Sequence, residues 1–132
     1  MSTLKVDNLL NSAGNESPIS VPGAAKAWIN FDGSGTISIR NSYNVSTITD
    51  NGTGNYTITF TNNLPSADFC VQLSATDDGS TSGQTDGYAY GCWLRGSIAA
   101  AFTTSTFRLR IGYPANTSAY DQSHIMVTVF HD

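Results

Sequence analysis

The sequence predicts an all-β protein, an antiparallel and jelly-roll-like β-sandwich of about eight strands with an extended N-terminal arm. Runs that alternate apolar and polar residues recur at short, even intervals from residue 26 onward. No window of a dozen residues holds the periodicity of a helix. The composition agrees, because only 12% of residues are charged and 39% are hydrophobic, and Ser, Thr, Asn and Gly supply much of the remainder. We therefore expect an arm over residues 1–23 and a head domain over residues 24–132.

The arm is predicted from proline and from its apolar residues. Pro18 and Pro22 remove backbone donors and favour extended chain. A solvated tail needs few apolar side chains, so those present are expected to contact a partner surface. The residues expected to make this contact, with a neighbouring subunit or with another protein, are Leu4, Val6, Leu9, Leu10, Ile19 and Val21.

The first strands follow the arm directly. Residues 27–31 form a strand pattern that ends at the turn signal Asp-Gly-Ser-Gly of residues 32–35. Residues 36–40 alternate with period two. Residues 44–49 alternate again, but Val45 and Ile48 are out of register with each other by one. This change of phase predicts a β-bulge or a bend between two sheets.

A hairpin is predicted next. The Asn51-Gly52 step within residues 50–54 provides the positive φ that tight hairpin turns need. The strand that follows, residues 56–60, is the clearest half-buried strand of the chain. Its expected inward residues are Tyr56, Ile58 and Phe60.

The second half contains four more strand patterns and one long loop. The strands are expected within residues 69–73, 88–94, 107–113 and 124–131, and a polar loop covers residues 77–87. Together with the first half, this is the strand number of a sandwich of two antiparallel sheets.

Charge and hydropathy exclude two classes of partner. The net charge of −4 and the pI near 4.8 argue against nucleic acid, since phosphate contacts need clustered Lys and Arg. No apolar run reaches the eighteen or so residues of a membrane span, so no membrane insertion is expected. No apolar run follows Lys5, so no signal peptide is expected and synthesis is expected in a cytoplasm.

The two cysteines, Cys70 and Cys92, lie in strand patterns. A cytoplasmic origin favours free, buried thiols, and a cross-strand disulfide is the alternative.

Residues able to support catalysis are scarce. His124 and His131 are the only histidines and are expected on opposite sides of one strand, a poor arrangement for a shared metal. We therefore expect no catalytic residues, no metal, no cofactor and no enzymatic activity. A glycan depolymerase is kept as a remote alternative, since its carboxylates would have to come from the polar loop.

A binding site is predicted in and after the polar loop. Aromatic faces beside hydroxyl-rich loops suit glycan or receptor binding, although subunit contact is an equally good use of such aromatics. Ca²⁺ is a weaker alternative for the loop, because its acidic residues do not have EF-hand spacing. The expected site residues are Asp77, Asp78, Asp86, Tyr88, Tyr90 and Trp93.

The order of residues also carries a resemblance. AWINFDGSGT, IRNSYNVS and ITDNGTGNYTITF follow one another within residues 26–60, and LPSADF follows at residues 64–69. The opening STLKVDNL, residues 2–9, is similar to the start of many tail-fibre chains. Together these segments, roughly half the chain, resemble a module of bacteriophage tail fibres and related tail proteins, notably those of cyanophages.

The resemblance implies a structural virion protein located in the tail or fibre. It implies a homotrimer that attaches to the host surface or to another virion protein, with other phage tail or virion proteins contacting the N-terminal arm. This chain departs from long fibres because it has no shaft. A carbohydrate-binding module that recognises a host surface glycan is the alternative function.

Overall fold

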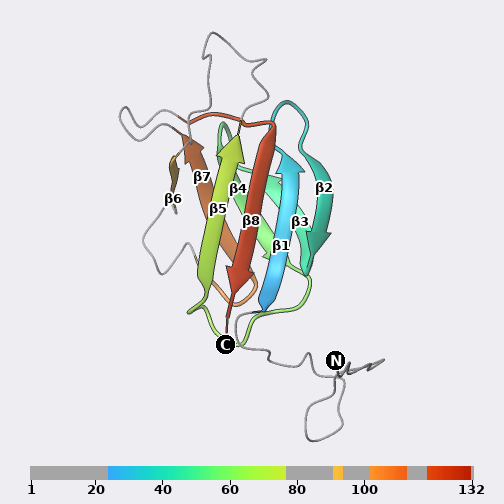
Figure 1. Ribbon diagram of the computed structural model, residues 1–132, viewed down its shortest axis with the longest axis vertical. Helices are drawn as coiled ribbons and strands as arrows, with labels where there is room; N and C mark the ends of the chain where they lie inside the picture. Colours follow the sequence, from blue (N-terminus) through green and yellow to red (C-terminus); the bar gives the residue numbers. More distant parts are fainter. Residues whose placement is uncertain (1–23, 77–90, 94–101, 113–118, 132) are drawn as a thin grey trace, which may run out of the picture.

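The computed structural model describes residues 24–76, 91–93, 102–112 and 119–131. These residues form eight strands in two four-stranded antiparallel sheets, and they contain no helix. Sheet A has the order β2-β1-β8-β5, and sheet B has the order β3-β4-β7-β6 (Figure 1). The strands are β1 (Ala25–Asp32), β2 (Ser38–Tyr43), β3 (Val45–Asp50), β4 (Asn55–Phe60), β5 (Cys70–Thr76), β6 (Gly91–Trp93), β7 (Thr106–Gly112) and β8 (His124–Phe130). The predicted all-β fold with two antiparallel sheets is confirmed.

The core lies between the two sheets, where the inward side chains of both meet. In β4, Tyr56, Ile58 and Phe60 are buried, as the alternation predicted. The Phe31 ring of β1 meets the Tyr56 ring of β4 edge-on at a centroid distance of 5.2 Å, which joins sheet A to sheet B. Each large apolar side chain buried in this way contributes about 1.5–3 kcal/mol. The other buried hydrophobic residues are Ala27, Ile29, Leu64, Phe69, Ala75, Phe107, Leu109, Ile111, Ile125, Val127 and Val129.

The chain passes from sheet A to sheet B at Asn44, between β2 and β3. Asn44 has a φ of 54°, a left-handed conformation that asparagine tolerates better than most residues. Its side-chain amide donates to the carbonyls of Lys26 and Asn62, and its Oδ1 accepts from the Asn62 amide at 2.8 Å. The predicted change of phase between Val45 and Ile48 coincides with a register shift between Val45 and Thr47 in the pairing of β3 with β4, directly after the passage between sheets at Asn44.

Side-chain oxygens close the turns at both hairpins. Asp32 accepts hydrogen bonds from the Ser34 amide (2.9 Å) and hydroxyl (2.6 Å), which lower the pKa of Asp32. Asp50 accepts from the Gly52 amide at 2.8 Å, so the predicted Asn-Gly turn is a hairpin between β3 and β4. Such bonds from Asp to a backbone amide two residues on are the usual reason for aspartate in turns.

A polar cluster joins the sheets at the start of β4, beside these turns. The buried Tyr56 hydroxyl donates to Asp121 Oδ1 (2.7 Å) and lies 3.1 Å from the Gly33 carbonyl. The Gly54 amide donates to the same Asp121 oxygen at 2.6 Å. Burial, together with the Asp121 carboxylate, raises the pKa of Tyr56 well above its ordinary value of 10.0.

Three expectations from the sequence need correction or narrowing. Cys70 is free but exposed, not buried, because Phe69 before it and Val71 after it turn toward the core. The strand expected over residues 36–40 lies instead at Ser38–Tyr43. Of the strand expected over residues 88–94, the structure describes Gly91–Trp93 alone.

We predict that Gly54→Ala destabilises the fold far more than Gly35→Ala. Both glycines have left-handed φ values, 59° and 62°, so the backbone cost of about 1–2 kcal/mol is shared. A Cβ at Gly54 would clash with the Ile111 carbonyl and lie 2.8 Å from the Tyr120 amide, whereas nothing lies within 4 Å at Gly35. Overpacking adds about 1–3 kcal/mol at Gly54 alone, measurable as a lower midpoint of urea unfolding. Equal midpoints for the two variants would contradict this account.

The raised pKa of Tyr56 predicts a loss of stability in alkali. Below pH 10 the contribution of Tyr56 to the free energy of unfolding does not change with pH. Above pH 10 the unfolded chain releases this proton while the folded chain keeps it, so the free energy of unfolding falls by about 1.4 kcal/mol per pH unit. Tyr56→Phe should cost about 1–3 kcal/mol at pH 7 and lack this alkaline component. Urea unfolding at pH 7 to 11 measures both, with Tyr43→Phe as the exposed-tyrosine control; parallel profiles for Tyr56→Phe and the parent would refute the assignment.

Candidate functional site

The binding residues expected from the sequence lie mostly outside the described part of the chain. Asp77, Asp78, Asp86, Tyr88 and Tyr90 fall between β5, which ends at Thr76, and β6, which begins at Gly91. For Trp93 the structure gives its place in β6, opposite Arg110 of β7. The arm residues Leu4, Val6, Leu9, Leu10, Ile19 and Val21 also lie outside the described residues. The predicted loop site and docking arm therefore stay predictions.

The outer face of sheet A is the candidate site that the described residues build. In β1, Ala27, Ile29 and Phe31 enter the core, so Trp28 and Asn30 between them point outward. Strand register then aligns outward residues of all four strands in two neighbouring rows. The aromatic row is Tyr43, Trp28, Thr128 and Gln72, and the amide row is Asn41, Asn30, Met126 and Ser74.

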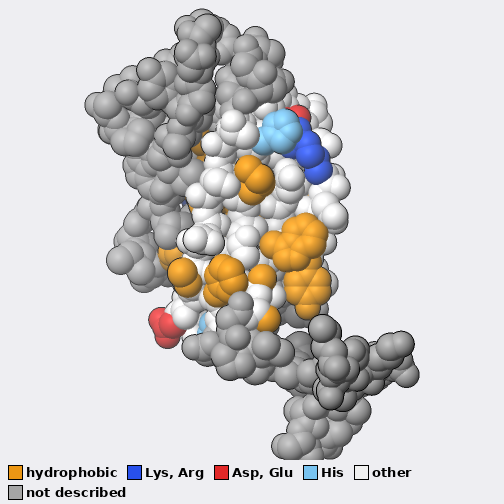
Figure 2. All heavy atoms as spheres, viewed as in Figure 1, with side chains coloured by type: hydrophobic (Ala, Val, Ile, Leu, Met, Phe, Trp, Pro, Cys, Tyr) orange, Lys and Arg blue, Asp and Glu red, His pale blue; other side chains and the backbone are white. Residues whose placement is uncertain are grey.

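The aromatic row offers a broad apolar surface at one side of the sheet. Trp28 of β1 and Tyr43 of β2 are direct cross-strand partners, with Tyr43 51% exposed and Trp28 partly buried. Figure 2 shows this face, on which hydrophobic side chains gather in separate groups divided by uncharged polar ones. The surface is thus mixed rather than a continuous apolar patch.

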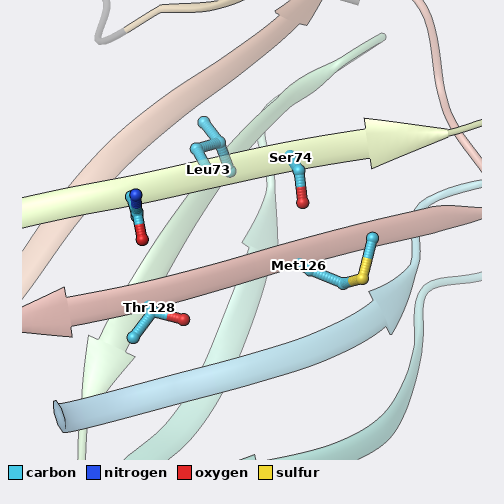
Figure 3. A pocket seen from close by; sticks show the side chains of 5 residues that line it. Leu73, Ser74, Met126 and Thr128 are labelled. Carbon is cyan, nitrogen blue, oxygen red and sulfur yellow. The ribbon is translucent and has the colours of Figure 1, made fainter. Parts of the chain in front are cut away.

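A shallow hollow of about 320 Å³ lies at the other side of the two rows. Ser74 of β5 and Met126 of β8 stand next to each other at this hollow (Figure 3). Met126 is 38% exposed. The lining residues are Gln72, Leu73, Ser74, Met126 and Thr128. The hollow is therefore adjacent, along each row, to Trp28 and Asn30 of β1.

Uncharged hydrogen-bonding groups are available across both rows. Among the described residues, the side chains of Gln72, Ser74 and Thr128 make no hydrogen bond with one another or with the rest of the fold. Asn30 Oδ1 is buried and has no partner in the described part of the chain, whereas Asn41 Oδ1 accepts from the Ser42 amide. The groups without a partner on Gln72, Ser74 and Thr128 gain from a ligand that can both donate and accept, whereas Asn30 Oδ1 is closed off from the surface.

Charged side chains lie at the margins of this face, where Figure 2 shows basic and acidic groups at the upper right and an acidic group at the lower left. Neither row contains an ionised side chain, and the nearest ion pair joins Arg40 Nη2 to Asp32 Oδ2 at 2.9 Å. This pair is partly exposed and neutral as a whole, so it adds little long-range field. The rows therefore suit an uncharged ligand.

The two histidines are engaged separately. His131 Nε2 lies 3.0 Å from Ser66 Oγ, and His124 Nδ1 lies 3.2 Å from Ser123 Oγ. A serine nucleophile requires a base whose other nitrogen is oriented by an acceptor, but His131 Nδ1 is buried without a partner among the described residues. That geometry does not form a triad, and the described residues hold no group of three or more potential His, Cys, Asp or Glu metal ligands.

Searches against protein-family models, curated proteins and solved structures found no match to this chain. In the described part of the chain, no helix has the length and apolar character to cross a bilayer. The candidate site is therefore argued from its own geometry.

Cys70 provides a direct check that this face of sheet A is accessible. It is exposed on the outer face, opposite Phe130 of β8. We predict that a maleimide labels native protein rapidly at Cys70, because buried thiols are inert and exposed ones react. Mass spectrometry with and without Cys70→Ser identifies the site, and labelling only after unfolding would show that this face is covered.

Proposed function

We propose that this chain is a structural virion protein, a tail fibre or fibre-like component that forms a homotrimer and attaches to the host surface or to another virion protein. The observation that carries the proposal is the position, within the fold, of the segment that resembles tail-fibre proteins. Residues 26–60 correspond to β1–β4, which are two antiparallel pairs, one in each sheet. The resemblance to tail-fibre proteins thus covers a folding unit of the sandwich, together with both of its turns.

A jelly-roll-like head is proposed from the placement of the last strands inside both sheets, although the consecutive pairs β1–β2, β3–β4 and β6–β7 each lie in one sheet. β8 lies between β1 and β5, and β7 lies between β4 and β6, so late strands separate earlier ones in both sheets. Successive strands also change sheets between β2 and β3, β4 and β5, β5 and β6, and β7 and β8. Double-sheet jelly rolls recur in viral capsid and lectin domains, which agrees with a virion role by analogy of fold.

Residues 1–23 are proposed as the docking and trimerisation arm. The described chain begins just before β1, whose first residue Ala25 is paired with Phe130 at the end of β8. From this end, the arm is proposed to contact a neighbouring subunit or another virion protein. The proposed role is non-enzymatic and needs no cofactor.

Light scattering tests the assembly. The full chain should have three times its monomer mass of 14.0 kDa. The double variant Leu9→Asp and Leu10→Asp should shift the mass toward the monomer, because it places charge where the arm is expected to bury apolar surface. Asn8→Asp adds a charge to the same segment without removing an apolar side chain, so it should stay trimeric. A parent protein that is monomeric at all concentrations would overturn the proposed assembly.

A further inference from the structure

The two outer rows of sheet A combine features that a saccharide site requires. Sugar rings have apolar faces, which stack on exposed aromatic side chains, and a rim of hydroxyls that both donate and accept hydrogen bonds. Trp28 and Tyr43 lie side by side at one end of the aromatic row, and Thr128 and Gln72 continue the same row. Ser74 and Asn30 provide a hydroxyl and an amide in the adjacent amide row.

We propose that the outer face of sheet A binds an uncharged saccharide. One sugar ring stacks on the Trp28–Tyr43 pair, and the chain of sugars runs across β8 to the hollow beside Ser74 and Met126. This inference rests on the proposed attachment function, since a saccharide on a host surface would be the ligand. It places recognition on a face formed by β1, β2, β5 and β8 rather than on the loop after β5.

The lack of charge in the two rows determines the class of saccharide. An acidic sugar would need Lys or Arg within the site, and neither row contains one. Arg40 is already paired with Asp32 at 2.9 Å. Neutral hexose, deoxyhexose or N-acetylhexosamine units therefore fit better than uronic or sialic acids.

A second copy of this chain is a poorer occupant of the same face. Five of the eight row residues are amides or hydroxyls: Asn30, Asn41, Gln72, Ser74 and Thr128. Burying these groups against another sheet costs about 1–3 kcal/mol for each group that the facing sheet leaves unpaired. A packed sheet would also have to fill the hollow of about 320 Å³. A saccharide brings its own hydroxyls, and water fills the remainder.

The experiment uses the full chain on an array of neutral and acidic oligosaccharides, followed by calorimetric titration of the strongest neutral one. Tyr43→Ser removes an exposed stacking ring, and Ser74→Tyr places bulk in the hollow while deleting no core side chain. Each should weaken binding by about tenfold or more. Tyr120→Ser removes another exposed tyrosine, 40% exposed and located near Gly54, and should leave the affinity unchanged. Thermal unfolding of each variant confirms that the fold is kept.

Three results would overturn the inference. The first is that the protein binds no neutral oligosaccharide, and the second is that both Tyr43→Ser and Ser74→Tyr leave binding intact. The third is that Ser74→Tyr loses self-assembly, which would assign the face to a second copy. Light scattering on the same samples separates the two proposals. A trimer that binds no sugar contradicts the saccharide site but agrees with the proposed assembly. A monomer that binds sugar contradicts the proposed assembly but agrees with the saccharide site.

Discussion

The register of β8 against its two neighbours fixes both faces of sheet A. β8 pairs with β1 on one side and with β5 on the other, and its inward residues fill the core while Met126 and Thr128 between them face outward. A slip of one residue would bring these two into the core and move the apolar set to solvent. The inward residues are Ile125, Val127 and Val129. Core and candidate binding surface are thus specified by the same pairing.

One carboxylate oxygen holds the two sheets together at the end of the sandwich where Gly33 and Gly54 lie. Asp121 precedes β8 of sheet A, yet its Oδ1 accepts from Tyr56 and from Gly54, which belong to β4 of sheet B and the turn before it. Because Tyr56 is fully buried, its hydroxyl needs this acceptor to avoid the cost of an unsatisfied polar group. The aromatic core and the turn glycine are therefore coupled through a single side chain.

Local alternation was enough to predict the strands and most inward residues. The inward set of β4 and the change of phase between Val45 and Ile48 follow from neighbouring residues alone. The same alternation places Trp28 outward and Cys70 exposed, although a buried thiol was expected at Cys70. Its position in the strand, next to the inward Phe69, decides its exposure more than its residue type does.

The candidate surface was missed because it depends on pairing between distant strands. Trp28 comes from the first strand and Thr128 from the last, and only their register makes them neighbours. No periodicity within either strand reveals which strand lies beside it. The site predicted at the loop, with residues such as Asp77 and Tyr88, was inferred from residue composition instead of strand pairing. These residues lie outside the described part of the chain.

The irregular pairing of β2 with β1, and of β3 with β4, affects how readily copies of this protein aggregate at high concentration. Both are outermost among the described strands of their sheets, and the ladder of each is interrupted, between Asn30 and Phe31 for β2 and between Val45 and Thr47 for β3. Outermost strands with regular backbone invite other chains to add by strand pairing, whereas bulges and polar side chains discourage it. β2 is mostly exposed and contains Arg40 and Asn41. Copies held at high local concentration would therefore resist amyloid-like aggregation along these edges.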